Sequence, residues 1–354
     1  MRNTTKKKGL IVLAAILAAA PISAQEVRRV SGRSVAIYNI AGHVEIVPGN
    51  GSEVVVRVSR HGDDADRLSI ETGEIRGRQT VRIVYPADEV VYPEMGRRSS
   101  TTQRVRDDGT FSDGGRGRGQ QVRVRGSGRG LEAWADLVIE VPRGQETHVY
   151  LAVGTVEARD VDGDIDIDTG SGAVSAHNMS GTLEIDTGSG AVEVMGMDGD
   201  LTVDTGSGSI RVSDVVAREV DLDTGSGQVV GIGIEARTLG VDTGSGSVNL
   251  ERIRSANVVV DTGSGSVELE LLTDVELLEI DTGSGSVTVW APSNLGGSLN
   301  IDTGSGGIDV DFPVEVRSAR RDSLRGTVGD GRGKIVSDTG SGSIRLLRTR
   351  SEIR

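Results

Sequence analysis

The amino-acid sequence predicts an all-β fold, a single-stranded parallel β-helix (β-solenoid) with about 18–21 residues per coil and with irregular N-terminal coils or a β cap. The pentapeptide Asp-Thr-Gly-Ser-Gly occurs nine times, and apolar residues alternate with polar ones on both sides of each copy. Aromatic residues make up 2% of the 354 residues, while 51 residues are glycine. A repeat of this period with few large side chains favours thin stacked coils over one globular core.

The flanks of the pentapeptide predict two strands in each repeat. When the Asp of each unit is numbered 0, positions −3, −1, +6 and +8 are apolar in nearly all units, as Leu201, Val203, Ile210 and Val212 illustrate. This alternation indicates two short strands, each with one buried face. A third apolar column, at position +11, predicts a third inward side of the coil: Met179, Met197, Val215, Ile234, Ile253 and Leu272.

The pentapeptide itself is interpreted as a corner between these strands. Glycine would let the backbone turn with positive φ at this corner. The Thr and Ser hydroxyl groups of successive coils are expected to form ladders that hydrogen-bond from coil to coil. Stacked in sequence order at about 4.8 Å per coil, roughly ten to twelve coils would form a rod about 50–60 Å long.

Residues 1–24 are typical of a secretory signal peptide. Basic residues precede a short apolar run from Gly9 to Ala20, and small residues up to Ala24 offer a cleavage site. The alternative is a retained membrane anchor, but a run of about 12 residues is short for a membrane span. The remaining chain has no cysteine and no second apolar segment. We therefore expect an exported protein of the periplasm, cell surface or exterior, without a transmembrane segment after cleavage.

Two regions precede the repeats. Residues 25–93 contain short alternating runs, such as Val54, Val56 and Val58, and are predicted to form a β cap or degenerate coils. Residues 94–130 are rich in Gly and Arg and are predicted to be a disordered insertion, because they offer little apolar surface for burial. This insertion is interpreted as a solvated loop, or as an electrostatic contact with an anionic envelope polymer or with the acidic rod.

The solenoid is predicted over residues 131–346 and a charged tail over 347–354. The step from Asp302 to Asp338 spans 36 residues and is interpreted as one irregular coil with an insertion, so that the unit of Asp338 would be the last coil. Arg345, Arg348 and Arg350 would then give the terminal edge a charge that discourages strand pairing between molecules.

The segment from Val35 to Leu346 resembles a bacterial family known as putative adhesins, a domain of unknown function built from β-strand repeats. The resemblance rests on Val141 to Gly144, on Gly154 to Ala158, on Val161 to Ile165 and on the serial Thr-Gly-Ser-Gly units. It implies a β-solenoid at the cell envelope and no assigned reaction. The Gly/Arg-rich insertion departs from the pattern of that family.

The aligned aspartates are the main candidate for a site. By parity they point outward, and neighbouring carboxylates about 5 Å apart would repel one another by roughly 0.5–1 kcal/mol per pair. We expect each carboxylate either to accept hydrogen bonds from Ser and Gly N–H groups of its own turn, or to share a calcium ion with the next coil. The candidate calcium ligands are Asp168, Asp186, Asp204, Asp223, Asp242, Asp261, Asp281 and Asp302.

Catalytic residues are not predicted. An apolar residue followed by Asp-Thr-Gly-Ser is also the active-site sequence of aspartic proteases, but those enzymes need two such loops that face each other so that two carboxylates share a proton. Copies that stack in one direction do not provide this geometry. The four histidines, His43, His61, His148 and His177, share no spacing of a metal site, and no cofactor other than calcium is expected.

Three functions remain open. The first is a non-catalytic cell-envelope protein, an adhesin-like binding or structural rod whose partner is an envelope polymer or a surface ligand. The second is an envelope-stress sensor that binds cationic peptides. The third, a carbohydrate-active β-helix enzyme, is disfavoured by the low aromatic content. Loss of the four basic residues in 1–24 would change the net charge from −13 to −17, which disfavours nucleic acid and anionic membranes as partners.

Overall fold

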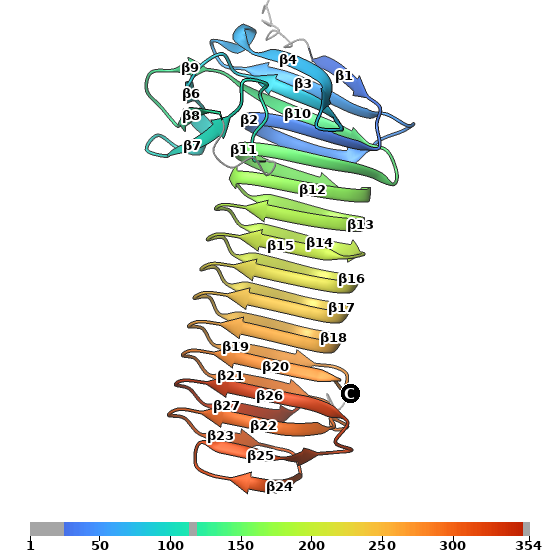
Figure 1. The fold of residues 1–354 in the computed structure, drawn as a ribbon, viewed down its shortest axis with the longest axis vertical. Helices are drawn as coiled ribbons and strands as arrows, with labels where there is room; N and C mark the ends of the chain where they lie inside the picture. Colours follow the sequence, from blue (N-terminus) through green and yellow to red (C-terminus); the bar gives the residue numbers. More distant parts are fainter. Residues whose placement is uncertain (1–24, 113–118, 350–354) are drawn as a thin grey trace, which may run out of the picture.

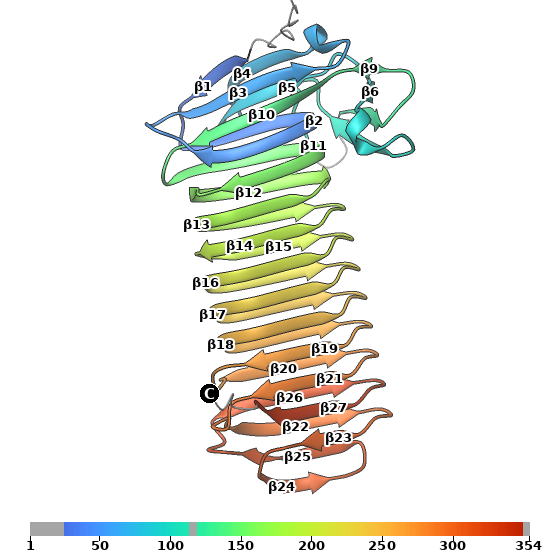
Figure 2. The same ribbon diagram turned by 180° about the vertical axis from the view of Figure 1, so that it is seen from behind.

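The computed structural model describes residues 25–112 and 119–349, and these form an elongated stack of β-strands with a broader N-terminal end (Figure 1, Figure 2). The predicted signal peptide, 1–24, lies outside the described residues, as do 113–118 in the insertion and 350–354 in the tail. No helix in the described ranges is long and apolar enough to cross a membrane.

Most strands belong to one large sheet. Its N-terminal strands are β1 (Glu26–Val30), β2 (Ser34–Pro48), β3 (Val54–His61), β4 (Ser69–Ile75), β5 (Arg78–Val84), β10 (Trp134–Val141) and β11 (Gln145–Arg159). Its middle strands are β12 (Asp162–Ser171), β13 (Val174–Thr187), β14 (Val192–Asp198), β15 (Leu201–Thr205), β16 (Ile210–Thr224), β17 (Val229–Thr243) and β18 (Val248–Thr262). Its C-terminal strands are β19 (Val267–Leu271), β20 (Leu277–Thr282), β21 (Val287–Ala291), β22 (Gly297–Thr303), β23 (Ile308–Val310), β24 (Val314–Ala319), β25 (Ser323–Val328), β26 (Gly333–Thr339) and β27 (Ile344–Arg348).

The middle of the molecule is a parallel β-solenoid, which confirms the predicted fold class. Each coil contributes two strand segments that pair in register with the same segments of the next coil. Positions −4 to +1 form one ladder, here called the Asp ladder, in which Asp204 pairs with Asp223. Positions +6 to +9 form the opposite ladder, in which Val192 pairs with Ile210. Parallel pairing at constant register therefore stacks equivalent residues in columns.

The inward columns are buried as the alternation predicts. Leu201, Val203, Ile210 and Val212 are each at most 1% exposed. Burial of a side chain of this size stabilises the fold by about 1.5–3 kcal/mol, and only stacking of the coils makes that burial complete.

The predicted third side is a bend that follows the opposite ladder. Position +10 has positive φ in successive coils: Asp160, Asn178, Gly196, Asp214, Gly233 and Arg252. The residue after it turns inward, and five of the six predicted +11 side chains are buried: Met179, Met197, Val215, Ile234 and Ile253. The sixth is different, because the register shifts and Leu271 rather than Leu272 pairs with Ile253.

The N-terminal end closes the stack with antiparallel strands. β2 lies parallel to β11 and forms a coil of its own, so coils begin well before residue 131. β5 and β10 lie parallel on β2, and their outer neighbours β4 and β3 run antiparallel to them. β1 then pairs antiparallel with β3, which covers the edge of the solenoid.

The C-terminal end contradicts the expectation that the coils stack in sequence order. β26 lies between β20 and β22, and β27 lies between β21 and β23, so the unit of Asp338 is inserted between those of Asp281 and Asp302. The end of the stack is instead closed by β25, antiparallel to β22, and by β24 (Figure 1). The prediction of a terminal Arg-rich coil was therefore wrong, because the chain doubles back to cover this edge.

The predicted disorder of residues 94–130 is wrong for the part that the structure describes. A separate four-stranded sheet contains β6 (Glu89–Val91), β7 (Ser100–Val105), β8 (Gln120–Arg125) and β9 (Leu131–Glu132). Short 3-10 helices occur at Ala65–Arg67 and Pro93–Met95. Val122 and Val124 alternate with arginines in β8 and are buried, as is Phe111. These few apolar residues suffice because the sheet packs beside the N-terminal end.

Candidate functional site

The threonine of the pentapeptide holds neighbouring coils together from inside the corner. Thr224 is fully buried; its hydroxyl donates to the carbonyl oxygen of Gly208 in the preceding coil at 2.8 Å and accepts from the N–H of Gly227 in its own coil at 3.0 Å. The donation to a glycine carbonyl recurs at Thr187, Thr205, Thr243, Thr262, Thr282, Thr303 and Thr339. The predicted hydroxyl ladder is replaced by this pattern except for one hydrogen bond, from Thr169 to Thr187.

The glycines of the pentapeptide permit close approach rather than positive φ. A Cβ atom on Gly208 would lie 1.6 Å from the carbonyl oxygen of Gly190, and one on Gly206 would lie 2.6 Å from that of Gly188. Neither Gly206 nor Gly208 has positive φ, so the predicted reason for these glycines was wrong. Every side chain larger than hydrogen would separate the coils, which makes the corner a spacer of the stack.

The aspartate column lies on the outside of the Asp ladder. Strand pairing places it in the spatial order 168, 186, 204, 223, 242, 261, 281, 338 and 302. The expected hydrogen bonds from the turn to its carboxylate are not formed where the Gly N–H binds the Thr hydroxyl instead, as at Gly208, Gly227 and Gly246. Asp302 pairs with Arg325 at 3.2 Å.

The geometry does not support the predicted calcium ligands. Among the described residues, no group of three or more His, Cys, Asp or Glu side chains is arranged to hold a metal ion. The Thr hydroxyl groups of the pentapeptide are buried on the inner side of the corner, as Thr205 shows, while the carboxylates point outward. Successive aspartates alone offer too few oxygen ligands for an ion that takes six to eight.

The outward positions of the Asp ladder form a continuous acidic face. Positions −4, −2 and 0 carry many carboxylates and a single lysine, Lys334. The carboxylates are those of Asp164, Asp166, Asp168, Glu184, Asp186, Asp200, Asp204, Glu219, Asp221, Asp223, Asp242, Asp261, Glu279, Asp281, Asp302 and Asp338. Only the aspartates were predicted as a column; the other acidic side chains become part of one face through the register of the coils.

Neighbouring carboxylates contribute to raised pKa values at Asp186, Asp221, Asp223 and Asp281. Burial raises the pKa of Asp186, and the nearby charges of Asp204, Asp166 and Glu184 raise it further. The pKa values of Asp221, Asp223 and Asp281 are raised by the same two causes, burial first and neighbouring carboxylates second. These four carboxylates lie among like charges that a cationic partner would relieve. Elsewhere on the face the charge is partly balanced, because Arg218 pairs with Asp200 and Glu219.

A histidine lies where the acidic face meets the N-terminal end. His148 of β11 is hydrogen-bonded through Nδ1 to Asp166 at 2.7 Å and through Nε2 to Glu146 at 3.0 Å. Burial lowers its pKa, but the hydrogen bonds to these two carboxylates outweigh burial and raise it overall. The ring is stacked beside Tyr150, which in turn stacks on Tyr38 at 4.6 Å between centroids. The cluster connects the first coils of the solenoid to its cap.

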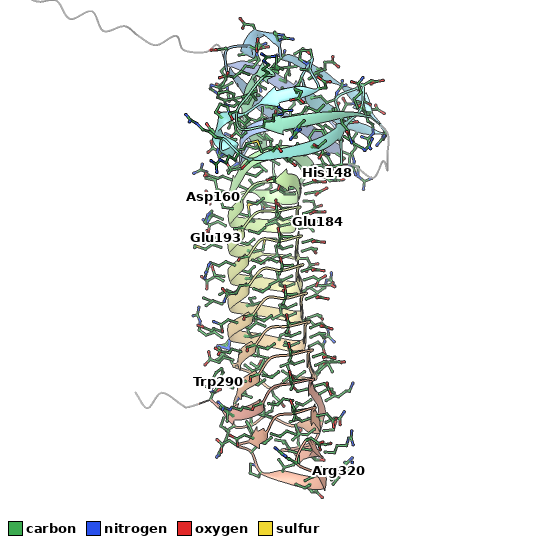
Figure 3. All side chains as sticks on the ribbon, turned by 90° about the vertical axis from the view of Figure 1, so that its left-hand side faces the viewer. His148, Asp160, Glu184, Glu193, Trp290 and Arg320 are labelled. Atoms are coloured by element: carbon green, nitrogen blue, oxygen red, sulfur yellow. The ribbon has the colours of Figure 1, made fainter. Side chains whose placement is uncertain are left out.

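The two ladders face opposite sides of the rod. In Figure 3, His148 and Glu184 of the Asp ladder lie on one side, while Glu193 and Trp290 of the opposite ladder lie on the other. The outward positions of the opposite ladder are mixed in character, with Arg211, Asn249 and Trp290 among its acidic residues. The acidic face is therefore a property of one side of the molecule and not of the whole rod.

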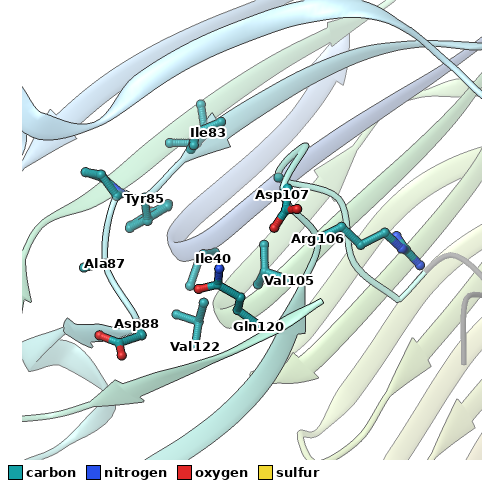
Figure 4. Close-up of a pocket in the computed structure, with 13 residues that line it drawn as sticks. Ile40, Ile83, Tyr85, Ala87, Asp88, Val105, Arg106, Asp107, Gln120 and Val122 are labelled. Atoms are coloured by element: carbon teal, nitrogen blue, oxygen red, sulfur yellow. The ribbon is translucent and has the colours of Figure 1, made fainter. Parts of the chain in front are cut away.

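A cavity of about 440 Å³ lies between the N-terminal end and the four-stranded sheet (Figure 4). Ile40, Ile83 and Val122 contribute to its apolar lining, and Asp107 and Gln120 to its polar rim. The Tyr85 hydroxyl also lies here; it donates to Asn39 or the Ala41 carbonyl, and burial raises its pKa. The titratable side chains among its described lining residues are Tyr85, Asp88, Arg106 and Asp107.

The fold and the acidic face together define a class of protein: an elongated parallel β-solenoid whose repeats present a charged surface. Residues 135–347 match the family model described as Toastrack DUF4097, and the chain belongs to this family. The resemblance expected from the repeats is thereby confirmed.

The chain was also compared with solved structures and with curated proteins. A crystal structure described as that of a "putative cell adhesion protein" from Clostridium sporogenes matches over 92% of this chain and 99% of that chain, at 11% sequence identity and a TM-score of 0.22. No curated protein matches the sequence.

Proposed function

We propose that this protein is an exported, non-catalytic cell-envelope protein of the adhesin type, a rod that binds an extended polycationic partner along its acidic face. The observation that carries the proposal is the run of carboxylates at position 0 in consecutive coils, augmented at positions −2 and −4. Coils about 4.8 Å apart place these charges within one Debye length of several neighbours, so their fields add.

The partner that suits this face is long, flexible and positively charged. Columns of equal charge have no unique register, so a cationic chain can bind at many offsets along the rod. Such binding is salt-sensitive and gains strength with the number of cations that bind at once. Amine-bearing envelope polymers, surface ligands and cationic peptides share this chemistry.

The experiment uses octalysine carrying a fluorophore, whose anisotropy is followed on addition of the protein at sodium chloride concentrations from about 20 to 300 mM. The test variant is Asp204→Asn/Asp223→Asn/Asp242→Asn. Loss of three charges that each contribute about 0.5 kcal/mol would weaken binding roughly tenfold and reduce its salt dependence.

The matched control removes three carboxylates from the opposite ladder, in Glu157→Gln/Glu193→Gln/Asp309→Asn, and changes the net charge of the protein equally. We expect it to bind octalysine nearly as well as the unmodified chain. Equal weakening by both triple variants would show that only net charge matters and would refute a binding face on the Asp ladder.

The same carboxylates favour a second candidate, an envelope-stress sensor for cationic peptides. The two functions differ in cells. A sensor predicts that deletion of the gene changes the response to cationic peptides while attachment to surfaces is kept, whereas an adhesin predicts the reverse.

A further inference from the structure

A groove on the opposite ladder combines an aromatic ring with carboxylates from neighbouring coils. It has a volume of about 360 Å³, and its lining includes Trp290, Glu251, Glu268 and Glu270. Trp290 in β21 is the direct strand partner of Glu270 in β19, so the ring lies beside a carboxylate of the preceding coil. This groove lies on the side of the rod away from the acidic face (Figure 3).

The groove has negative charge. Among the described residues that line it there is no lysine or arginine. The Glu251 carboxylate accepts a hydrogen bond from the side chain of Asn249 at 3.0 Å, and that of Glu270 accepts one from the backbone N–H of Arg252 at 3.2 Å. These neutral donors orient the two carboxylates without neutralising them, so the site keeps its capacity for a positive charge.

A second, independent feature of the groove is an unused hydroxyl group. The Oγ1 atom of Thr349 is buried and has no hydrogen-bond partner among the described residues, and Thr349 lines the same groove. A buried polar atom without a hydrogen-bond partner destabilises the fold. A ligand with N–H groups at this place would satisfy it.

We propose that this groove binds an organic cation, an alkylammonium or guanidinium group, which packs against the ring of Trp290 and pairs with Glu268 and Glu270. An aromatic ring attracts a cation through its quadrupole, and adjacent carboxylates add charge-assisted hydrogen bonds. The site uses no residue of the Asp ladder, so it does not depend on binding at the acidic face.

The ligand class follows from the mixture of groups. A bare metal ion would gain nothing from the indole ring and would find too few oxygen atoms in fixed positions, as the described residues hold no metal-binding group. A neutral sugar or amide would leave three carboxylates without a counter-charge. A guanidinium group satisfies the ring, the carboxylates and the Thr349 hydroxyl together.

The experiment follows the fluorescence of Trp290. The chain has two tryptophans, so Trp134→Phe leaves Trp290 as the only reporter. Ethylguanidinium is the probe, and ethylurea, which has nearly the same shape and no charge, is its control. We expect a saturable change with ethylguanidinium and none with ethylurea at the same ionic strength.

Variants of the carboxylates test whether ethylguanidinium binds at this groove. In the Trp134→Phe background, Glu268→Gln/Glu270→Gln should weaken binding at least about tenfold, while Glu184→Gln/Glu279→Gln on the acidic face should leave it unchanged. Absence of a saturable change, an equal response to ethylurea, or undiminished binding by Glu268→Gln/Glu270→Gln would each overturn the proposal. Failure of octalysine binding would not affect it.

Discussion

The two ladders of the solenoid are made by the same coils, yet they present different outer surfaces. Their inward columns are alike, as the buried pairs Leu201 and Val203, and Ile210 and Val212, show. Their outward columns differ, because the Asp ladder has an Asp at position 0 of every unit, while the opposite ladder mixes acidic, basic and aromatic residues. Inward residues and corners therefore specify the stack, and the outward residues are free to define what binds to it.

The largest expected effect comes from the corner, on which both ladders depend. Gly208→Ala should lower the free energy of unfolding by about 3 kcal/mol, because the added methyl group would overlap the carbonyl of Gly190. Urea unfolding followed by circular dichroism measures this. Ser207→Ala, at the exposed neighbouring position, should change stability by less than about 0.5 kcal/mol. Equal stability of the two variants would show that the coils do not need this contact.

A buried threonine hydroxyl should contribute more to the free energy of unfolding than an outward threonine hydroxyl. Thr224→Val keeps the shape but leaves the Gly208 carbonyl and the Gly227 N–H without their partner, which should cost about 2–3 kcal/mol. Thr202→Val, on the outward face of the Asp ladder, should be nearly neutral. The same unfolding measurement compares them, and a neutral Thr224→Val would mean that the hydroxyl does not tie the coils together.

The next largest effect should be a pH dependence of the stability of the fold. It arises from His148, where the acidic face contacts the cap. The pKa of His148 is raised in the fold, so its stabilising contribution is present below about pH 6.5 and is lost as the pH rises through its folded pKa. His148→Gln should therefore flatten the decline of stability with rising pH that the unmodified chain shows between mildly acidic and mildly alkaline pH. Thermal unfolding across this range, with His177→Gln as control, is the measurement, and a similar pH profile for His148→Gln and the unmodified chain would rule the effect out.

The smallest effect should come from relief of repulsion within the acidic face. The raised pKa of Asp223 means that the folded chain holds this proton more strongly than the unfolded chain does, so its ionisation weakens the fold as the pH rises. Asp223→Asn should therefore stabilise the protein slightly, by about 0.5 kcal/mol at neutral pH and low salt. The gain should shrink in high salt, and a loss of stability would indicate that the carboxylate has a favourable partner.

The periodicity was enough to predict the inward columns, since burial repeats with each coil. The left-handed position +10 was not predicted, although Asn178, Gly196 and Asp214 are residue types that tolerate positive φ. The exchange of coil order at the C-terminal end could not be predicted, because the units of Asp281, Asp302 and Asp338 carry nearly the same pattern and any of them could pair. The order depends on β25 and on the short connection to β26, which no periodicity describes.

The acidic face and the Trp290 groove could be anticipated only in part. The Asp column was evident from the pentapeptide, but the additional carboxylates at positions −2 and −4 vary from coil to coil. Glu251, Glu270 and Trp290 all occupy position +9, so an alignment of the units in register would have placed them together. The role of Thr349 depends on the inserted position of β27 and could not have been inferred from the order of the units.

Site-specific labelling offers the most direct measurement of where a cationic partner binds. The chain has no cysteine, so Thr202→Cys on the Asp ladder and Ser213→Cys on the opposite ladder can each carry one fluorophore. Octalysine with a quencher is then added at low salt. We predict strong quenching at position 202 that disappears with added salt, and weak quenching at position 213. Equal or stronger quenching at position 213 would contradict a binding surface on the acidic face.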